Sequence, residues 1–395
     1  MLADRFNLRL SRGQHILNQD IALSPDIEFS EDAERAWTLP AHTYWESSWF
    51  SREKSAIFHR GWQCIGHINE VPETGDYMTH TVVDQPVLVI RDQQNQVKAF
   101  HNVCKHRAHI LLSEERGTLG KHLIACPYHA WSYDLSGALR SAPQCELVSG
   151  FDKNEINLDS IKTEIILGFI FINLDPAANA LEPQISAGSK RFAVHFDDLE
   201  SYQLASTTAF DIKGNWKNVG DNLLECYHCH PAHKAFVDLV DMDTYLVETA
   251  GIWSWQGGIT RPQNVAYRIP DGLSDSQREF ITFFVWPNMA FTRFPGSDAM
   301  AIFVFDPVAP EITRQRFAIY TPDGTLDQTS QAIADYFSEV LGPEDVSLVE
   351  NVQKGLHSMS YERGRFMVDS KRSYFSEHAV HHFHSLVLQH MRGHA

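Results

Sequence analysis

The chain has 395 residues, 43% of them hydrophobic, and a net charge of −17. This length allows two or three domains with their own cores, and the acidic balance argues against nucleic-acid binding through phosphate contacts. The N-terminus carries charges where a secretion signal needs an apolar core, and the longest apolar run is about half of a membrane span. With six Cys and no such signal, we expect a cytoplasmic protein without a disulfide framework.

Residues 1–57 are predicted to form an N-terminal arm followed by a helix. Residues 1–40 are polar and contain the breakers Pro25 and Pro40, so they are expected to have little structure of their own. In residues 44–60 apolar side chains recur at helical spacing. We expect this segment to pack on the C-terminal domain.

Residues 58–175 are predicted to form a compact all-β domain. Segments 77–83, 87–91 and 97–102 alternate in polarity or are rich in β-branched residues. The apolar run Ile165–Leu174 predicts one buried strand. Residues 176–189 are rich in Ala, Pro, Asn and Gly, which predicts the connection to the next domain.

Residues 176–395 are predicted to form a larger α+β domain. Strand-like segments occur at 201–213, around Trp253, around Phe283, at 301–306 and at 316–320. Helix-like segments occur at 216–227, 327–341, 344–361 and 377–392. The fold class is therefore α+β: an all-β domain and a larger domain whose central antiparallel sheet is covered by helices.

Two short motifs in the β domain could hold metal. They are Cys104-Lys-His106 and Cys126-Pro-Tyr-His129, and each follows a strand-like segment. A zinc site is one possibility, although structural zinc sites usually space their sulfur ligands two to four residues apart. In a Rieske [2Fe–2S] centre two Cys hold one iron and two His hold the other, so the motifs could also supply such a cluster.

A second candidate metal site lies in residues 215–233, NWKNVGDNLLECYHCHPAH. Glu225 and His228 share one face of a helix, and His233 follows Pro231, where the chain must bend. Two imidazoles and a carboxylate can hold iron with positions left open for dioxygen. A zinc site or a helix end rich in His would fit the same residues.

The motifs together resemble those of Rieske non-haem iron oxygenase α subunits. Residues 102–107 (NVCKHR) and 126–131 (CPYHAW) are similar to the family's cluster loops, although the 19 residues between the two halves form a slightly longer gap. The spacing Glu225-x-x-His228-x-x-x-x-His233 matches the family's mononuclear-iron motif. The resemblance implies that Cys104 and Cys126 bind one cluster iron and His106 and His129 the other.

The resemblance also implies roles around the second iron. His228 and His233 would be ligands, Asn222 would lie near the metal, and Glu225 would pass electrons from the cluster of the neighbouring protomer. The third ligand would be Asp345, because a Glu follows it five residues later as in the family, with Glu344 as the alternative. Simple capping of a helix N-terminus by acidic residues would explain Glu344 and Asp345 equally well.

Most family members have Asp at the position of Glu225, and Glu occurs in relatives that act on choline, carnitine or betaines. This similarity implies the terminal oxygenase of a monooxygenase that attacks a C–H bond next to nitrogen and so causes N-demethylation or C–N cleavage. NAD(P)H electrons would come from a separate flavin and iron–sulfur reductase, and the oxygenase would be a homotrimer. The alternatives are an aromatic-ring-hydroxylating dioxygenase and a pure electron carrier, which would not need the second iron.

Aromatic side chains of the second sheet are candidates for holding the ammonium group by cation–π attraction. The chosen residues are Trp253, Trp255, Trp286 and Phe303. Ordinary core packing would explain the same side chains. Cys64 and Cys145 are expected to be buried structural residues, and Cys226 and Cys229 receive no role. The His-rich segment near the C-terminus is expected to be a packed or solvated helix.

Overall fold

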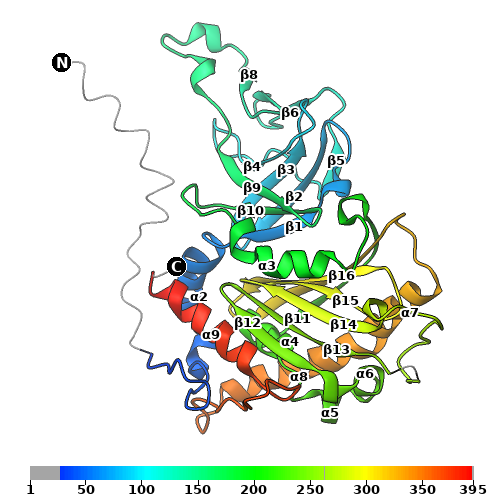
Figure 1. The fold of residues 1–395 in the computed structure, drawn as a ribbon. Coiled ribbons are helices and arrows are strands. Elements are labelled where there is room, and N and C mark those ends of the chain that lie inside the picture. The colour runs from blue at the N-terminus through cyan, green and yellow to red at the C-terminus, as the bar shows by residue number, and fades with distance from the viewer. Residues whose placement is uncertain (1–26, 262, 394–395) are drawn as a thin grey trace.

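The computed structural model describes residues 27–261 and 263–393, so most of the predicted N-terminal arm lies outside the described residues. A β domain stands on a larger α+β domain (Figure 1). Helix α2 (Ser47–Glu53) and the π-helical turn η2 (Lys54–Phe58) belong to the segment predicted to be helical. Within these described ranges, no helix is long and apolar enough to cross a membrane.

The β domain is built on a seven-stranded antiparallel sheet with a three-stranded sheet at its far end. In spatial order the large sheet contains β1 (Gln63–His67), β10 (Phe169–Asn173), β9 (Ser160–Ile166), β4 (Val97–His101), β3 (Gln85–Arg91), β2 (Asp76–Val82) and β5 (Arg116–Thr118). The small sheet contains β6 (Leu123–Ala125), β7 (Ser132–Asp134) and β8 (Leu139–Ser141). The three strands predicted between residues 77 and 102 are confirmed.

The apolar run at 165–174 is a hairpin, so the prediction of one buried strand was wrong. Strand β9 ends at Ile166 and pairs with β10 across a two-residue turn. Leu167 and Gly168 both have positive φ, 55° and 80°, as in the tight turns that match the twist of antiparallel strands. A Cβ on Gly168 would lie 2.2 Å from His67 Nε2, so the turn also needs glycine for space.

The α+β domain contains a second seven-stranded antiparallel sheet. Its spatial order is β11 (Gln203–Ile212), β17 (Ile312–Thr321), β16 (Met300–Ala309), β15 (Met289–Arg293), β14 (Glu279–Val285), β13 (Trp253–Ile259) and β12 (Leu246–Ala250). Helix α3 (Glu182–Ala193) begins within the predicted domain connection at 176–189 and occupies eight of its fourteen residues. Its side chains Ile185 and Phe192 are buried against the sheet.

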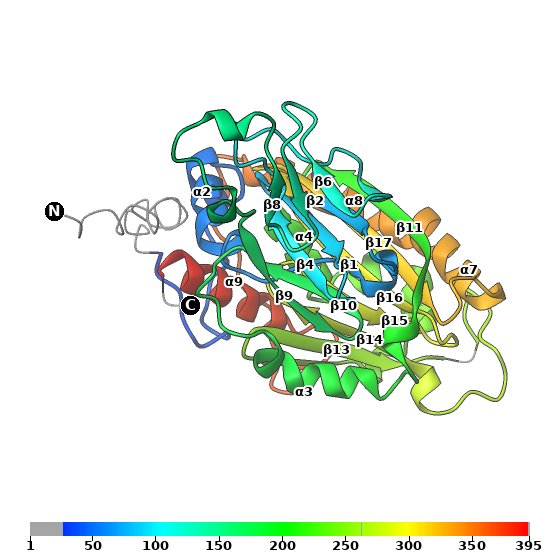
Figure 2. The same ribbon diagram turned by 90° about the horizontal axis from the view of Figure 1, so that it is seen from above.

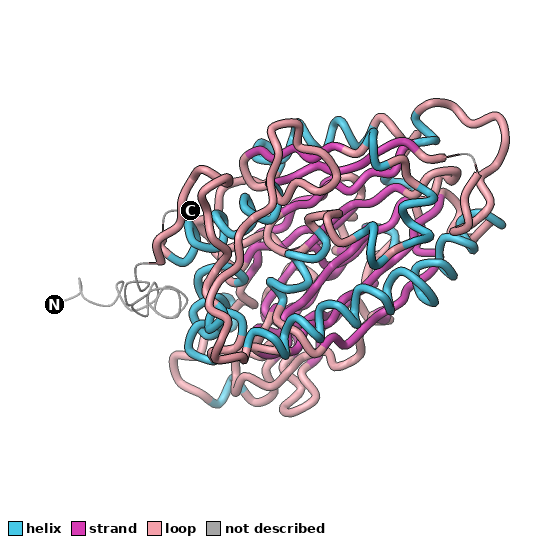
Figure 3. Tube along the Cα trace, turned by 90° about the horizontal axis from the view of Figure 1, so that it is seen from below, coloured by secondary structure: helices cyan, strands magenta, loops and turns pink. Residues whose placement is uncertain are grey.

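The two faces of this sheet have different partners. One face packs against α3 and the β-domain strands β1 and β10, and Figure 2 shows the β domain above this face. The other face is covered by helices (Figure 3). These helices are α4 (Trp216–Leu223), α5 (Cys229–Ala232), α6 (Lys234–Leu239), α7 (Gln328–Tyr336), α8 (Gly342–Leu356) and α9 (His378–Met391). The four predicted helices are present, with the first ending at Leu223 and the third at Leu356.

A fully buried ion pair fastens the N-terminal helix to α4. Glu53 and Lys217 are both completely buried, with 2.6 Å between Glu53 Oε1 and Lys217 Nζ. The Glu53 carboxylate also accepts hydrogen bonds from the indoles of Trp49 (2.8 Å) and Trp216 (2.9 Å). Burial lowers the pKa of Lys217, and Glu53 opposes that shift. The pair therefore ties α2 to the helix that leads into the candidate iron site.

We predict that Glu53→Met destabilises the protein by roughly 3–5 kcal/mol, because it leaves a buried ammonium without its counter-charge. The double substitution Glu53→Met with Lys217→Met should recover a large part of this loss. Urea denaturation followed by tryptophan fluorescence measures both, with exposed Glu34→Gln as the control. A Glu53→Met variant as stable as the control would contradict the structural role of the pair.

Candidate metal centres

The two metal-binding loops of the β domain have the same backbone construction. One follows β4 and the other joins β6 to β7. In each loop the carbonyl of the Cys accepts a hydrogen bond from the Ala four residues later, Ala108 N to Cys104 O (2.9 Å) and Ala130 N to Cys126 O (3.1 Å). Both alanines have positive φ, 54° and 56°. The two loops therefore have the same tight-turn conformation.

The two loops bring the four predicted ligand residues together, as a pair of cysteines and a pair of histidines. Cys104 and Cys126 are buried, whereas His106 and His129 are exposed, and the two imidazole centroids are 4.6 Å apart. Trp131 stacks on His106 at 4.9 Å. Two sulfurs on the inner side and two imidazoles on the solvent side are the donor set of a cluster with unlike irons. The residues present therefore fit a Rieske [2Fe–2S] group.

Tyr133 supports the buried side of this centre. Its hydroxyl oxygen accepts a hydrogen bond from the backbone of Lys105 (3.0 Å) and lies 3.3 Å from Cys104 Sγ. Since the backbone N–H is the donor in the first contact, the hydroxyl proton can be donated to sulfur. Hydrogen bonds to ligand sulfurs are among the factors that set the potential of such clusters.

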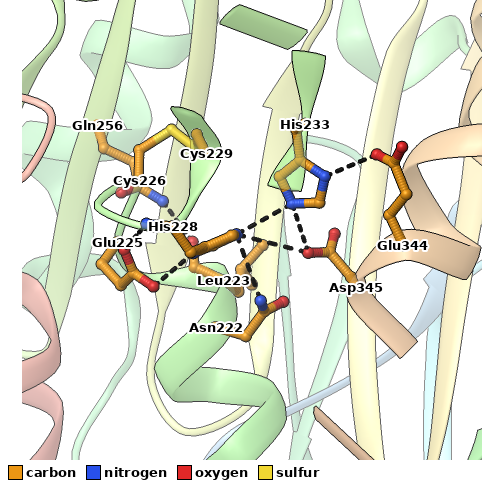
Figure 4. Close-up of a disulfide and its surroundings, with 10 residues drawn as sticks. All are labelled: Asn222, Leu223, Glu225, Cys226, His228, Cys229, His233, Gln256, Glu344 and Asp345. Atoms are coloured by element: carbon orange, nitrogen blue, oxygen red, sulfur yellow. Dashed lines mark hydrogen bonds and ion pairs between the residues drawn. A yellow bond between two sulfur atoms is a disulfide. The ribbon is translucent and has the colours of Figure 1, made fainter. Parts of the chain in front are cut away.

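The second candidate centre joins three side chains from two distant parts of the chain. His228 and His233 flank α5, and Asp345 lies in the first turn of α8. The Nε2 atoms of the histidines are 3.0 Å apart, and Asp345 Oδ1 is 3.5 Å from that of His228 and 2.9 Å from that of His233. Figure 4 shows the three groups facing one point. Two imidazoles and one carboxylate that converge in this way could hold a metal ion.

The short distances between these groups shift the pKa values of His228 and Asp345. Burial alone would lower the pKa of His228, but hydrogen bonds with Asp345 and Glu225 outweigh it and raise the value to about 10. Burial would raise the pKa of Asp345, but its bonds with the two histidines lower it to about 2. These charge-assisted hydrogen bonds hold the three side chains together, and a metal ion must displace protons to bind.

A carboxylate contacts Nδ1 of each imidazole, the ring nitrogen that does not face the other two groups. Glu225 contacts His228 Nδ1, and Glu344 Oε2 lies 2.8 Å from His233 Nδ1 (Figure 4). Such contacts fix the tautomer of a ligand histidine and leave Nε2 for the metal. The geometry favours Asp345 over Glu344 as the third donor, because only Asp345 contacts both Nε2 atoms. Asn222 Nδ2 lies 3.4 Å from His228 Nε2.

A cavity opens beside the three converging groups. Of the four predicted substrate aromatics, Phe303 lines it. Trp253 and Trp255 point to the opposite face of the sheet, where Trp255 packs between Phe283 and α3 under the guanidinium of Arg191. Trp286 packs against Trp216 and Phe383 away from the cavity. These three assignments were wrong.

The aromatic side chains that do line the cavity come from helices, from the other set of strand positions and from residues that flank strands. They are Phe236, Tyr245, Phe280, Phe294 and Phe337, in addition to Phe303. Phe280 and Phe283 share strand β14 but face opposite sides, since side chains alternate along a strand. This alternation was visible in the sequence, but the face that holds the metal was not.

A disulfide bond lies beside the second candidate centre. Cys226 and Cys229 form a disulfide that brackets His228, and both residues line the cavity. No role had been expected for them, although Cys-x-x-Cys spacing is a known redox signature. Cys64 is buried as predicted, whereas Cys145 is only partly buried.

The His-rich C-terminal segment is the packed helix α9, as predicted. His384 is fully buried and its Nε2 lies 2.8 Å from a carboxylate oxygen of Asp221. Its Nδ1 accepts a hydrogen bond from the backbone of Leu39. The helix thus fastens the chain near residue 39 to α4.

Comparison with known proteins agrees with both centres. Residues 61–152 match the Rieske [2Fe-2S] domain and residues 199–393 match the ring hydroxylating alpha subunit (catalytic domain). The chain is 37% identical to the carnitine monooxygenase oxygenase subunit of Acinetobacter pittii, over 95% of this chain and 98% of the relative. It is 31% identical to the chloroplastic choline monooxygenase of Atriplex hortensis, over 92% and 80%.

The solved structures include a quaternary ammonium Rieske monooxygenase, CntA. One of its structures superimposes with a TM-score of 0.85 at 37% identity, covering 92% of this chain and 98% of that chain. CntA has also been solved with the substrates L-carnitine and γ-butyrobetaine. The chain therefore belongs to the Rieske non-haem iron oxygenases, as an α subunit with a [2Fe–2S] domain and a mononuclear-iron domain, in the branch of the quaternary ammonium monooxygenases.

Proposed function

We propose that the protein is the terminal oxygenase component of a monooxygenase that oxidises a C–H bond next to nitrogen in a quaternary ammonium compound. The observation that carries the proposal is the convergence of His228, His233 and Asp345 at an aromatic cavity. The 37% identity to a carnitine monooxygenase subunit supports the substrate class over the aromatic-ring alternative. The expected outcome is N-demethylation or C–N cleavage. A cytoplasmic location stays a prediction.

In this proposal His228, His233 and Asp345 are the iron ligands, and Cys104, His106, Cys126 and His129 hold the cluster. When bound, the iron supplies activation of dioxygen and the cluster supplies electrons one at a time. The protein's own task is orientation: Glu225 and Glu344 fix the two imidazoles, and Asn222 lies beside His228. The electrons come from NAD(P)H through a separate flavin and iron–sulfur reductase.

The cavity suits a cation. Its described lining includes the carboxylates of Glu225 and Asp345 and no Lys or Arg. Aromatic rings attract quaternary ammonium groups by cation–π interaction. Phe280 lies next to Phe236 (4.9 Å) and Phe294 (5.5 Å), which makes a connected aromatic wall. We infer that this wall holds the methylated nitrogen near the metal.

The arrangement of the two centres favours electron transfer between protomers. Figure 1 shows the cluster loops near β6 at the far end of the β domain, whereas α5 and α8 lie at the opposite end of the molecule. His129 and the neighbouring Tyr128 are exposed, so another protomer can approach them. Glu225, already in contact with His228, would receive the electron. A homo-oligomer, expected to be a trimer, follows from this role, and inter-subunit electron transfer is described for CntA.

We predict that Asp345→Asn lowers Fe(II) affinity more than Glu344→Gln does. The first substitution removes a ligand charge, while the second weakens only the support of His233, at a cost of about 10- to 100-fold. Anaerobic Fe(II) titration measures the affinities, and the visible spectrum of the cluster reports that the fold is intact. Exposed Glu339→Gln is the matched control. Equal iron affinity in all three variants would contradict the assignment of Asp345.

We predict that Glu225→Gln keeps both metal centres but slows transfer between them by about 100-fold. The amide can still accept a hydrogen bond from His228 Nδ1, and excess Fe(II) offsets a loss of affinity like that of Glu344→Gln. Iron should therefore remain bound, but the negative charge of the bridge is lost. Stopped-flow reoxidation of the pre-reduced cluster, with substrate and oxygen present, measures the transfer. Reoxidation as fast as in the Glu339→Gln control would disprove the bridge.

The proposed function as a whole is tested by turnover. The oxygenase, a reductase and NADH are mixed with a panel of choline, carnitine and betaines and with a second panel of aromatic compounds. Oxygen uptake coupled to release of a demethylated or cleaved amine should occur with the first panel. Coupled turnover of aromatic compounds alone would favour the ring-hydroxylating alternative.

A further inference from the structure

One buried polar group beside the iron cavity has a free hydrogen-bonding site. Gln256 lies on β13, is 3% exposed and lines the cavity. Its Nε2 donates a hydrogen bond of 2.5 Å to the carbonyl of Leu223. Among the described residues, its buried Oε1 has no hydrogen-bond partner.

The orientation of this amide is fixed by its partner. Leu223 is the last residue of α4, so its carbonyl has no partner within the helix. A carbonyl can only accept, so the nitrogen of Gln256 must face it, and the oxygen is left as an acceptor. Figure 4 shows Gln256 beside Cys226 on the His228 side of the metal site.

The nearby hydroxyl groups do not meet this need. Thr282 is directly opposite Gln256 on β14, but its Oγ1 lies 3.5 Å from Oγ1 of Thr292, so these two hydroxyls face each other. The other cavity walls near β14 are the rings of Phe280 and Phe236. A buried acceptor that is left unpaired is costly, and a ligand that supplies the missing donor gains affinity by satisfying it.

We propose that Gln256 is a specificity-determining residue, whose Oε1 accepts a hydrogen bond from a hydroxyl group on the substrate. The preferred substrates are then quaternary ammonium compounds that carry a hydroxyl, such as amino alcohols and hydroxy acids, over their deoxy analogues. The inference rests on the proposed function and narrows its substrate class. The aromatic wall binds the ammonium group, and Gln256, opposite Thr282 on the adjacent strand, recognises the hydroxyl.

The test uses two pairs of compounds that differ by one hydroxyl. They are L-carnitine with γ-butyrobetaine, and choline with ethyltrimethylammonium. Sites built to bind a substrate hydroxyl discriminate strongly against analogues that lack it, and we expect a preference of about 10- to 100-fold in kcat/KM for the hydroxylated member of the accepted pair. Calorimetric Kd values for the same compounds, measured without reductase, should show the same order.

Gln256→Met keeps the length of the side chain and removes the acceptor, so it should reduce the preference to within a few-fold. Ser254→Ala is the matched control, because Ser254 is two residues away on the same strand and its buried hydroxyl also lacks a partner, yet it does not line the cavity. The control should keep the preference. If Gln256 acted only by supporting Leu223, the variant would weaken both members of a pair equally and leave their ratio unchanged, which would overturn the proposal.

If Gln256→Met fails to fold, the Kd and kcat/KM values of the wild-type protein still test the role of Gln256. Equal Kd and equal kcat/KM for both members of an accepted pair would overturn the role of Gln256 while the proposed function stands. Neither binding nor turnover of any of the four compounds would overturn both.

Discussion

The structure depends on the meeting of Asp345 with His228 and His233, because these residues come from segments more than a hundred positions apart. The aspartate Oδ1 lies 3.5 and 2.9 Å from the Nε2 atoms of the two imidazoles, and so holds α8 against the turn that carries the histidines. A second link reinforces it: Gln353 Oε1 of α8 accepts hydrogen bonds from Asn215 N (2.9 Å) and Asn218 Nδ2 (2.7 Å), at the start of α4. The buried Glu53–Lys217 pair fixes the same end of α4 to α2. The ligands are therefore positioned by helices whose own places are fixed by buried polar contacts.

The outer carboxylates show how one arrangement can serve two tasks. Glu344 and Glu225 orient His233 and His228 in the same way, through Nδ1. Only Glu225 also lines the cavity, next to the half-exposed Tyr227. Both carboxylates reach solvent, with 13% of the Glu225 side chain and 39% of the Glu344 side chain exposed. Because the Glu225 carboxylate contacts Nδ1 of His228, it supports that imidazole and is not one of the three converging groups.

Sequence reasoning succeeded where the chemistry is local and failed where it depends on packing. The loops around Cys104 and Cys126 and the spacing of His228 and His233 are short-range features, so the pairs could be predicted from spacing and resemblance. The hairpin at 165–174 was missed because its Leu167-Gly168 turn lies inside a run that is apolar throughout. Trp253 and Trp255 were chosen because alternation shows that two residues share a face but not which face meets the metal. The sheet buries aromatic side chains on both faces, so composition could not decide.

The same two-faced sheet determines how the centres can communicate. The β domain and α3 cover one face, and the iron site with its cavity lies on the other, among the helices. An electron from the cluster of the same chain would have to pass along the β domain and then through the packed sheet. The exposed His106 and His129 belong to the loops near β6, at the far end of the β domain (Figure 1). A second copy that brings its cluster loops to the surface near Glu225 avoids the barrier, so the architecture of one chain already favours an oligomer as the working enzyme.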